Sequence, residues 1–390
     1  MILLLLAVPT FHHDVEPVLQ RHCQTCHRPG AIAPMPLITY EQVRPWARAI
    51  REKVLLGKMP PWFAASGGPF ANDPRLSDAS KRTFSLWADD KAPEGPAADA
   101  PPPLEWPDGW RIGKPDLVAG MNEPFAVPAR GDVDYQFIVV KLGLPEDRWI
   151  ERVEVRPSNH RVVHHAVVYV RERGDPWPEN GRRVTTNDIL AVYTPGQPPF
   201  EARPGMAKFV PAGADLVLQM HYQTIGELVR DQTRIGIVFA RQVPEKRVLT
   251  LQLNNSTFHI PPGERNYRVT ASGTLPNDAL LLSMFPHMHL RGAAFDYEID
   301  LGEGRVETLL RVAPYDYYWQ LNYILATPRL LKKGTRLRAT GWYDNSPNNP
   351  RNPDPEAEVT YGEQSHDEMM IGFFDVAVPR DFDKRRFFAR

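Results

Sequence analysis

The sequence predicts a mainly β protein in which two β-sandwich domains follow a small α-helical domain. Short apolar runs separated by turn residues recur from about residue 115 to the C-terminus, as in all-β domains. Forty prolines in 390 residues, about twice the usual share, favour short strands and ordered loops over long helices. Helical spacing of apolar residues is confined to residues 11–95.

The length of 390 residues accommodates two or three domains. Acidic and basic residues nearly balance, 47 against 46, so no basic surface for nucleic acid is expected. Residues 1–10 contain a short apolar run that resembles the core of a secretion signal. Because the run is too short to span a bilayer, we expect an exported protein, periplasmic or secreted, without a membrane span. A disordered start with no targeting role is the alternative.

The helical domain, residues 11–95, should contain three helices. Thr39 and Gln42 form a capping box at the start of the second helix, and Gly57 follows its last turn. Phe84 and Trp87 lie on one side of the third helix and should be buried. The helices are expected over residues 14–22, 40–57 and 77–90.

A Pro-rich linker, residues 96–114, should be extended and semi-rigid. Two β domains are expected after it, at residues 115–245 and 246–390. Turn residues separate their candidate strands. These strands are expected over residues 137–141, 149–156, 161–171, 215–224, 234–241, 247–253, 267–271, 279–285, 295–300, 308–312, 336–342 and 370–378.

The motif Cys23-x-x-Cys26-His27 indicates a covalently attached c-type haem, with both thiols bonded to the haem and His27 as an axial iron ligand. These are the only cysteines, so no other disulfide can form. Met59, just after a predicted helix, is the expected sixth ligand, and Met35 is the second choice. A histidine could take that place instead: His22, His12 or His13. A thioredoxin-like redox pair or a disulfide loop is the alternative to haem.

Three later histidine groups have the spacing of metal ligands. His287 and His289 alternate at the end of an apolar strand, so both can reach one ion. Met369 would add a thioether, a soft ligand that favours copper cycling through Cu(I). Taken alone, the two histidines could be exposed by coincidence and Met369 could be an ordinary core residue.

His164 and His165 are adjacent, and neighbours on a flat strand face opposite sides. Both can bind one metal only if the strand bulges there. His221 lies on a predicted strand and shares a face with Gln219. The alternatives are one buried and one exposed histidine in the pair, and a structural role for His221.

Together these motifs resemble the copper type II, ascorbate-dependent monooxygenase family, which includes peptidylglycine α-hydroxylating and dopamine β-hydroxylating enzymes. In that family a His-His pair and the His of Leu-Gln-x-His-Tyr hold one copper, which His164, His165 and His221 match. A His-x-His and the Met of Asp-Glu-Met hold the other, which His287, His289 and Met369 match. The N-terminal region separately resembles a cytochrome c-like domain.

The resemblance implies two jelly-roll-like β-sandwich domains whose two copper ions face each other across a solvent cleft. It implies that His287, His289 and Met369 are catalytic. The enzyme would use O2 as co-substrate to hydroxylate a C–H bond of a small organic substrate. The other copper would be an electron-transfer site, with electrons relayed by the haem from an external donor.

Three positions depart from the peptide-hydroxylating relatives, whose polar side chains hold the substrate carboxylate. Here those positions are Phe285, Ile371 and Phe373, which suit an apolar substrate. His366 should be a surface residue, and Asp367 and Glu368 should be structural. Three rival functions remain open: a non-enzymatic copper and haem electron-transfer or copper-binding protein, a zinc hydrolase with three histidine ligands, and, third, protein–protein adhesion through the β domains.

Overall fold

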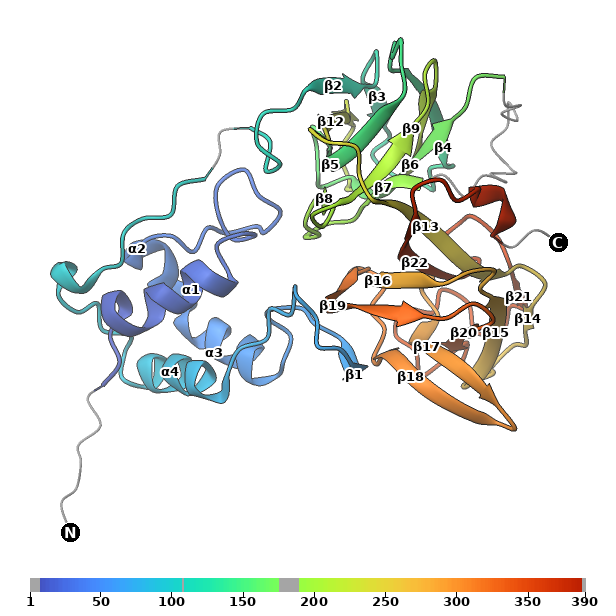
Figure 1. Cartoon of the computed structure of the whole chain (residues 1–390). Helices are drawn as coiled ribbons and strands as arrows, with labels where there is room; N and C mark the ends of the chain where they lie inside the picture. Colours follow the sequence, from blue (N-terminus) through green and yellow to red (C-terminus); the bar gives the residue numbers. More distant parts are fainter. Residues whose placement is uncertain (1–7, 107–108, 175–188, 388–390) are drawn as a thin grey trace. The chain divides into compact units, whose positions relative to one another are not determined.

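The computed structural model describes residues 8–106, 109–174 and 189–387, and Figure 1 shows its elements. The predicted signal segment lies mostly outside these described residues. Contacts divide the chain into two compact units, a helical unit of residues 8–62 and 73–106 and a β unit of residues 63–72 and 109–387. Strands dominate the described chain, so the prediction of a mainly β protein is confirmed.

The helical unit contains short helices at the predicted positions. A 3-10 turn at Arg44–Trp46, which contains Pro45, divides the second predicted helix, because proline removes a helical hydrogen bond. The Thr39 N–H donates to Gln42 Oε1 at 3.3 Å, as the capping box predicts. The helices are η1 (Phe11–Val15), α1 (Glu16–His22), α2 (Tyr40–Val43), α3 (Ala47–Leu55) and α4 (Asp78–Asp89). Among the described residues, no helix combines the length and apolarity that crossing a lipid bilayer requires.

Residues 63–72 belong to the β unit, although they interrupt the helical part of the sequence. Strand β1 (Ala64–Gly67) pairs antiparallel with β18 (Arg305–Val312). A Cβ atom at Gly67 would lie 2.3 Å from the Leu309 carbonyl oxygen, so only glycine permits this pairing. The helical domain predicted at residues 11–95 is therefore interrupted by a strand that the sequence did not reveal.

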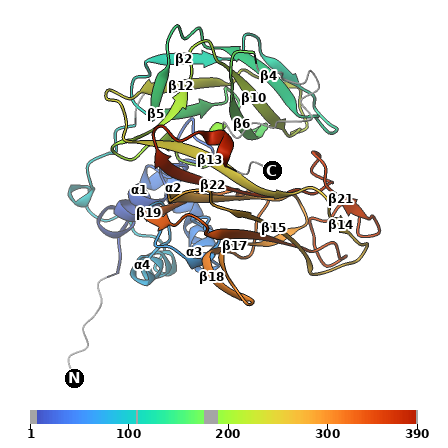
Figure 2. The same cartoon turned by 45° about the vertical axis from the view of Figure 1, so that its right-hand side comes forward.

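Figure 2 shows the β unit as four layers of sheet. The first layer contains β2 (Leu117–Gly120), β12 (Arg234–Phe239), β5 (Arg148–Arg156) and β9 (Met206–Val210). The second contains β4 (Gln136–Lys141), β10 (Asp215–Tyr222), β6 (Val163–Arg171) and β7 (Ile189–Tyr193). The third contains β13 (Lys246–Asn255), β22 (Met370–Pro379), β16 (Ala279–His287) and β19 (Tyr323–Leu331). The fourth contains β1, β18, β17 (Gly292–Gly302), β20 (Arg336–Tyr343) and β15 (Tyr267–Thr274).

The first and third layers are parts of one nine-stranded sheet, joined where β9 pairs with β13. This sheet contains strands from both sides of residue 245, since β13 begins at Lys246, so the predicted division into two domains at that position stays a prediction. All twelve predicted strands are present. The face-to-face packing of the sheets gives the β unit the expected sandwich character.

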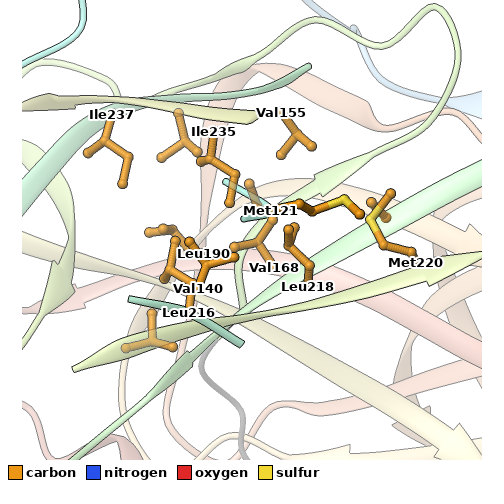
Figure 3. Close-up of a cluster of buried hydrophobic side chains, with 14 of the residues drawn as sticks. Met121, Val140, Val155, Val168, Leu190, Leu216, Leu218, Met220, Ile235 and Ile237 are labelled. Atoms are coloured by element: carbon orange, nitrogen blue, oxygen red, sulfur yellow. The ribbon is translucent and has the colours of Figure 1, made fainter. Parts of the chain in front are cut away.

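Strands β6 and β10 contribute to two cores, because alternate residues point to opposite faces. Leu216, Leu218 and Met220 of β10 point into the core between the first two layers, together with Ile235 and Ile237 of β12 (Figure 3). The opposite face of β10, which carries Val217, packs between the second and third layers. His221 shares that second face, and the candidate site is built there.

Candidate metal centre

Strand β6 contains the bulge that the His164–His165 pair requires. His165 pairs with His221 of β10, but Tyr222 pairs with Val163, so His164 is an extra residue in its strand. A bulge of this kind turns two successive side chains to one face. Both imidazoles therefore point toward the third layer, away from the core that holds Val163.

The three histidines His164, His165 and His221 form a compact triad. One ring nitrogen from each lies within 4.8 Å of the others, and all three rings are buried. The Nδ1 atoms of His164 and His165 are 3.1 Å apart. His165 Nε2 lies 3.1 Å from Tyr135 Oη, and the tautomer that donates this hydrogen bond leaves Nδ1 free to bind an ion. Buried His221 Nδ1 has no hydrogen-bond partner among the described residues.

His287 and His289 have the opposite arrangement, with Nδ1 fixed and Nε2 available. His287 Nδ1 donates to Gln320 Oε1 at 2.8 Å, and His289 Nδ1 donates to the Asp367 carbonyl at 3.2 Å. Such acceptors typically fix the tautomer of a metal-binding histidine. His289 is fully buried, and its Nε2 atom has no partner within the described parts of the chain.

The Asp-Glu-Met segment lies next to His289. The buried Glu368 carboxylate accepts hydrogen bonds from the backbone N–H groups of His289 at 2.8 Å and Arg291 at 2.6 Å. Met369 follows it and is buried in the same apolar cluster as Ile371. Glu368 thus has the structural role expected of it. His366 is half exposed and lies 3.6 Å from Asp132, as predicted for a surface residue.

The two histidine sets meet in one buried cluster. The ring centroids of His165 and His287 are 5.1 Å apart, and these residues are 4% and 5% exposed. Tyr317 stacks on His164 at 4.3 Å, with its ring 6.4 Å from that of His289. The expected solvent cleft between two separate sites is therefore wrong for this structure, because side chains of the second and third layers pack together there.

Burial keeps all five imidazoles neutral. Burial, with a smaller contribution from neighbouring His287, lowers the pKa of His221 to about 3, and burial lowers that of His287 to about 4. Burial and neighbouring histidines also hold the pKa values of His164, His165 and His289 well below their usual range. Neutral imidazole is the form that binds metals. An unpaired buried nitrogen costs roughly 1–3 kcal/mol, and a bound ion would remove that cost at His221 and His289. The donor set therefore fits a transition metal.

The haem motif lies at the end of α1. His27 Nδ1 donates to the Met35 carbonyl at 3.1 Å, which leaves Nε2 for an iron atom. Burial raises the pKa of the Cys23 thiol to about 12, and no disulfide joins it to Cys26. A thioredoxin-like pair needs a lowered thiol pKa, so this environment does not favour thiol redox chemistry.

The candidates for the sixth haem ligand differ in their surroundings. Met35 contributes its backbone carbonyl to His27 Nδ1, and its side chain packs against the core of the helical unit. His12 Nδ1 is hydrogen-bonded to Glu16 Oε2 at 2.8 Å, and His13 Nδ1 lies 3.0 Å from Asp14 Oδ1. His22 bonds the Pro74 carbonyl through Nδ1. Met59 is half-buried and remains the expected ligand.

The predicted substrate residues lie beside the histidine cluster. Phe285 and Phe373 stack at 5.7 Å, and the Phe373 ring lies 6.4 Å from that of His287. Both line a pocket of about 100 Å³. Ile371 is buried on the same face of β22 and does not line this pocket.

Sequence reasoning did not find Tyr135, Tyr317 and Gln320, which contact the histidines. Tyr135 precedes β4, and the other two lie between β18 and β19. Tyrosine and glutamine in connecting segments have no distinguishing pattern, and only the packing of separate layers brings them to the site.

No protein-family model matches the sequence, and no curated protein matches it. Among solved structures, the major capsid protein P2 of bacteriophage PM2 aligns with TM-score 0.32 and 11% identity over 70% of this chain and 99% of that one. PNGase F, a glycosylasparaginase from Flavobacterium meningosepticum, aligns with TM-score 0.33 and 11% identity over 68% of this chain and 96% of its own. Allantoicase from Saccharomyces cerevisiae aligns with TM-score 0.16 and 8% identity over 65% and 80% of the two chains. Scores this low assign neither a family nor a function.

Proposed function

We propose that this chain is an exported copper-dependent monooxygenase that hydroxylates a C–H bond of a small, fairly apolar organic molecule. The observation that carries the proposal is the bulge at His164. It turns the imidazoles of His164 and His165 toward His221. The buried Nδ1 atom of His221 has no hydrogen-bond partner among the described residues. A bulge disrupts the hydrogen-bond ladder of a buried strand, and bulges are enriched next to functional sites, where they re-aim side chains.

His164, His165 and His221 would hold one copper ion, and His287, His289 and Met369 the other. Bound copper would supply one-electron redox chemistry with dioxygen, for a net reaction of RH + O2 + 2 e⁻ + 2 H⁺ giving ROH + H2O. The protein's own part is to keep the imidazoles neutral and to fix their tautomers through Gln320 and the Asp367 carbonyl. Burial of the cluster excludes bulk water from it.

The electrons would come from an external donor through a c-type haem bound by Cys23, Cys26, His27 and Met59. The hydrogen bond from His27 Nδ1 to the Met35 carbonyl, which leaves Nε2 available, supports this part. We further propose that the helical unit is cytochrome c-like and that the β unit consists of two jelly-roll-like sandwich domains. The pocket beside Phe285 and Phe373 supports an apolar substrate.

A non-enzymatic electron-transfer protein is the second candidate, and the burial of all five histidines favours it. An oxygen-activating metal needs an open position, and none of these histidines is more than 6% exposed. A zinc hydrolase is less well supported, since hydrolytic zinc also needs an open position for water and Met369 is a soft ligand.

Oxygen uptake by chain matured with copper and haem separates these candidates. A monooxygenase consumes oxygen and reoxidises its haem only when an organic substrate is present, and His289→Ala abolishes this. His259→Ala is the matched control, because His259 is an exposed histidine paired with Glu358 at 3.1 Å. Coupled redox of haem and copper without substrate-dependent oxygen uptake would contradict the proposal and favour the electron-transfer protein.

A further inference from the structure

The pocket beside the histidine cluster has a polar end as well as an apolar one. Its lining includes Lys208, Thr250, Ser283 and Asp375 at one end and the Phe285–Phe373 stack at the other. These polar side chains come from four neighbouring strands: β9, β13, β16 and β22. Lys208, Thr250 and Ser283 are buried, and Asp375 is partly exposed.

The polar groups form one directional chain of hydrogen bonds. Lys208 Nζ donates to the carbonyls of Ile189 and Leu190 and, at 2.8 Å, to Thr250 Oγ1. These three hydrogen bonds use all three N–H groups of the Lys208 ammonium. Thr250 Oγ1 then donates to Asp375 Oδ1 at 2.5 Å, and Ser283 Oγ donates to Asp375 Oδ2 at 2.9 Å. Each carboxylate oxygen accepts one bond and retains capacity for another. The chain therefore ends in an acceptor with unused capacity at the pocket.

Strand register places the two ends of the pocket along one sheet face that leads to the metal ligands. Ser283 pairs with Asp375, Phe285 pairs with Phe373, and His287 pairs with Ile371. These rows are two residues apart, so the polar row lies roughly 13 Å from the His287 row along the strands. The stacked phenylalanines form the row between them.

From this arrangement we propose that the pocket binds a small uncharged organic molecule by a hydroxyl group at Asp375 and directs its apolar end toward His287. The hydroxyl supplies the donor that the Asp375 oxygens can still accept, and the apolar end packs on Phe285 and Phe373. The lining carries two cationic side chains, Lys208 and Arg203, and two anionic ones, Asp375 and Glu201, so the pocket has no net charge to compensate a desolvated ion. The further statement that this apolar end is the part of the molecule that reacts rests on the proposed function.

Four slender compounds of similar size test the class of ligand. The probe is 1-hexanol, whose extended chain is about as long as two strand residues, ~7 Å. Its comparison compounds are 1-methoxypentane, an isomer without a donor, hexanoate and hexylammonium. Calorimetry on the full chain should show 1-hexanol binding at least about tenfold more tightly than each comparison compound. Equal or tighter binding of the ether, the anion or the cation would overturn the assignment.

Asp375→Asn should weaken 1-hexanol binding by about tenfold, since the charged acceptor is lost. Asp296→Asn is the matched control, because Asp296 is a buried carboxylate of β17 that pairs with Arg311 at 2.9 Å, away from this pocket. Unchanged affinity in Asp375→Asn would also overturn the assignment. If this variant does not fold, the four compounds on the unmodified chain still decide the matter.

The binding experiment needs no turnover, so its result is independent of oxygen chemistry. Selective, Asp375-dependent binding without oxygen uptake would support the pocket assignment and count against the monooxygenase. Oxygen uptake with other compounds, together with no preference for 1-hexanol, would overturn the pocket assignment alone.

Discussion

The imidazole ring of His165 packs edge-on against that of His287, with centroids 5.1 Å apart. His165 belongs to the second layer and His287 to the third, so this contact joins the two histidine sets. Copper ions held by these sets would each have a ligand in this ring contact. Electron exchange between them would cross imidazole rather than solvent.

The first prediction is magnetic coupling between two bound Cu(II) ions. Because the His165 and His287 rings are in contact, the oxidised, copper-saturated chain should give a broadened, coupled electron paramagnetic resonance spectrum. Removing one ion with His289→Ala should leave a single, uncoupled Cu(II) signal. Two independent Cu(II) signals of full intensity in the unmodified chain would contradict the contact, though not the presence of copper.

The second prediction concerns pH and the metal-free chain. Unfolded histidine has a pKa of about 6.5, whereas the folded values are about 3 for His221 and about 4 for His287. Below pH 6.5 the unfolded chain therefore binds more protons than the folded chain, and the free energy of unfolding falls as pH falls. Each of these two histidines should cost up to about 1.4 kcal/mol per pH unit between pH 6 and pH 4.

Urea unfolding in the presence of a chelator at pH 7, 6 and 5 measures this effect. His287→Gln removes one titrating group and should reduce the dependence on pH, whereas His259→Gln changes an exposed residue and should not. A free energy of unfolding that stays constant from pH 7 to pH 5 would show that these imidazoles are not buried and neutral.

The third prediction separates the two metal sites through Glu368. Its carboxylate accepts the backbone N–H groups of His289 and Arg291, so it positions His289 without binding metal itself. Glu368→Ala should destabilise the fold by roughly 1–3 kcal/mol. It should also lower copper occupancy at His287 and His289 while the triad keeps its ion. Glu298→Ala is the control, since Glu298 pairs with Arg338 at 2.8 Å in the fourth layer. Equal loss of copper in Glu368→Ala and Glu298→Ala would contradict the proposal that Glu368 positions His289 for copper binding.

The fourth prediction concerns the haem. Met59→Ala should lower the haem reduction potential and change its spin state, because a methionine ligand raises the potential. Met35→Ala should change neither, since Met35 contributes its backbone carbonyl to His27. Optical spectra and a potentiometric titration of the two variants provide the comparison. A larger change in reduction potential in Met35→Ala than in Met59→Ala would indicate that Met35, and not Met59, is the sixth haem ligand.

Much of the site follows from local sequence rules. Adjacent histidines cannot share a face of a flat strand, so the bulge at His164 could be predicted from the pair itself. Alternation likewise predicts that Gln219 and His221 share a face. The strands were predictable because their apolar runs are bounded by turn residues.

Other features depend on tertiary packing and have no local pattern. The contact between His165 and His287 arises where two sheets stack, and nothing within either strand encodes that approach. Strand β1 was missed because Ala64–Gly67 lacks β-branched and aromatic residues and forms only by pairing with β18. The Asp375 hydrogen-bond chain was missed for the same reason, since its members come from four strands.

Metal content per chain tests the central claim most directly. The account predicts two copper ions and one haem in chain matured with both. It also predicts one copper in His221→Ala and one in His289→Ala, with His259→Ala unchanged. Zinc in place of copper, or a full copper complement in either ligand variant, would contradict the paired-copper assignment.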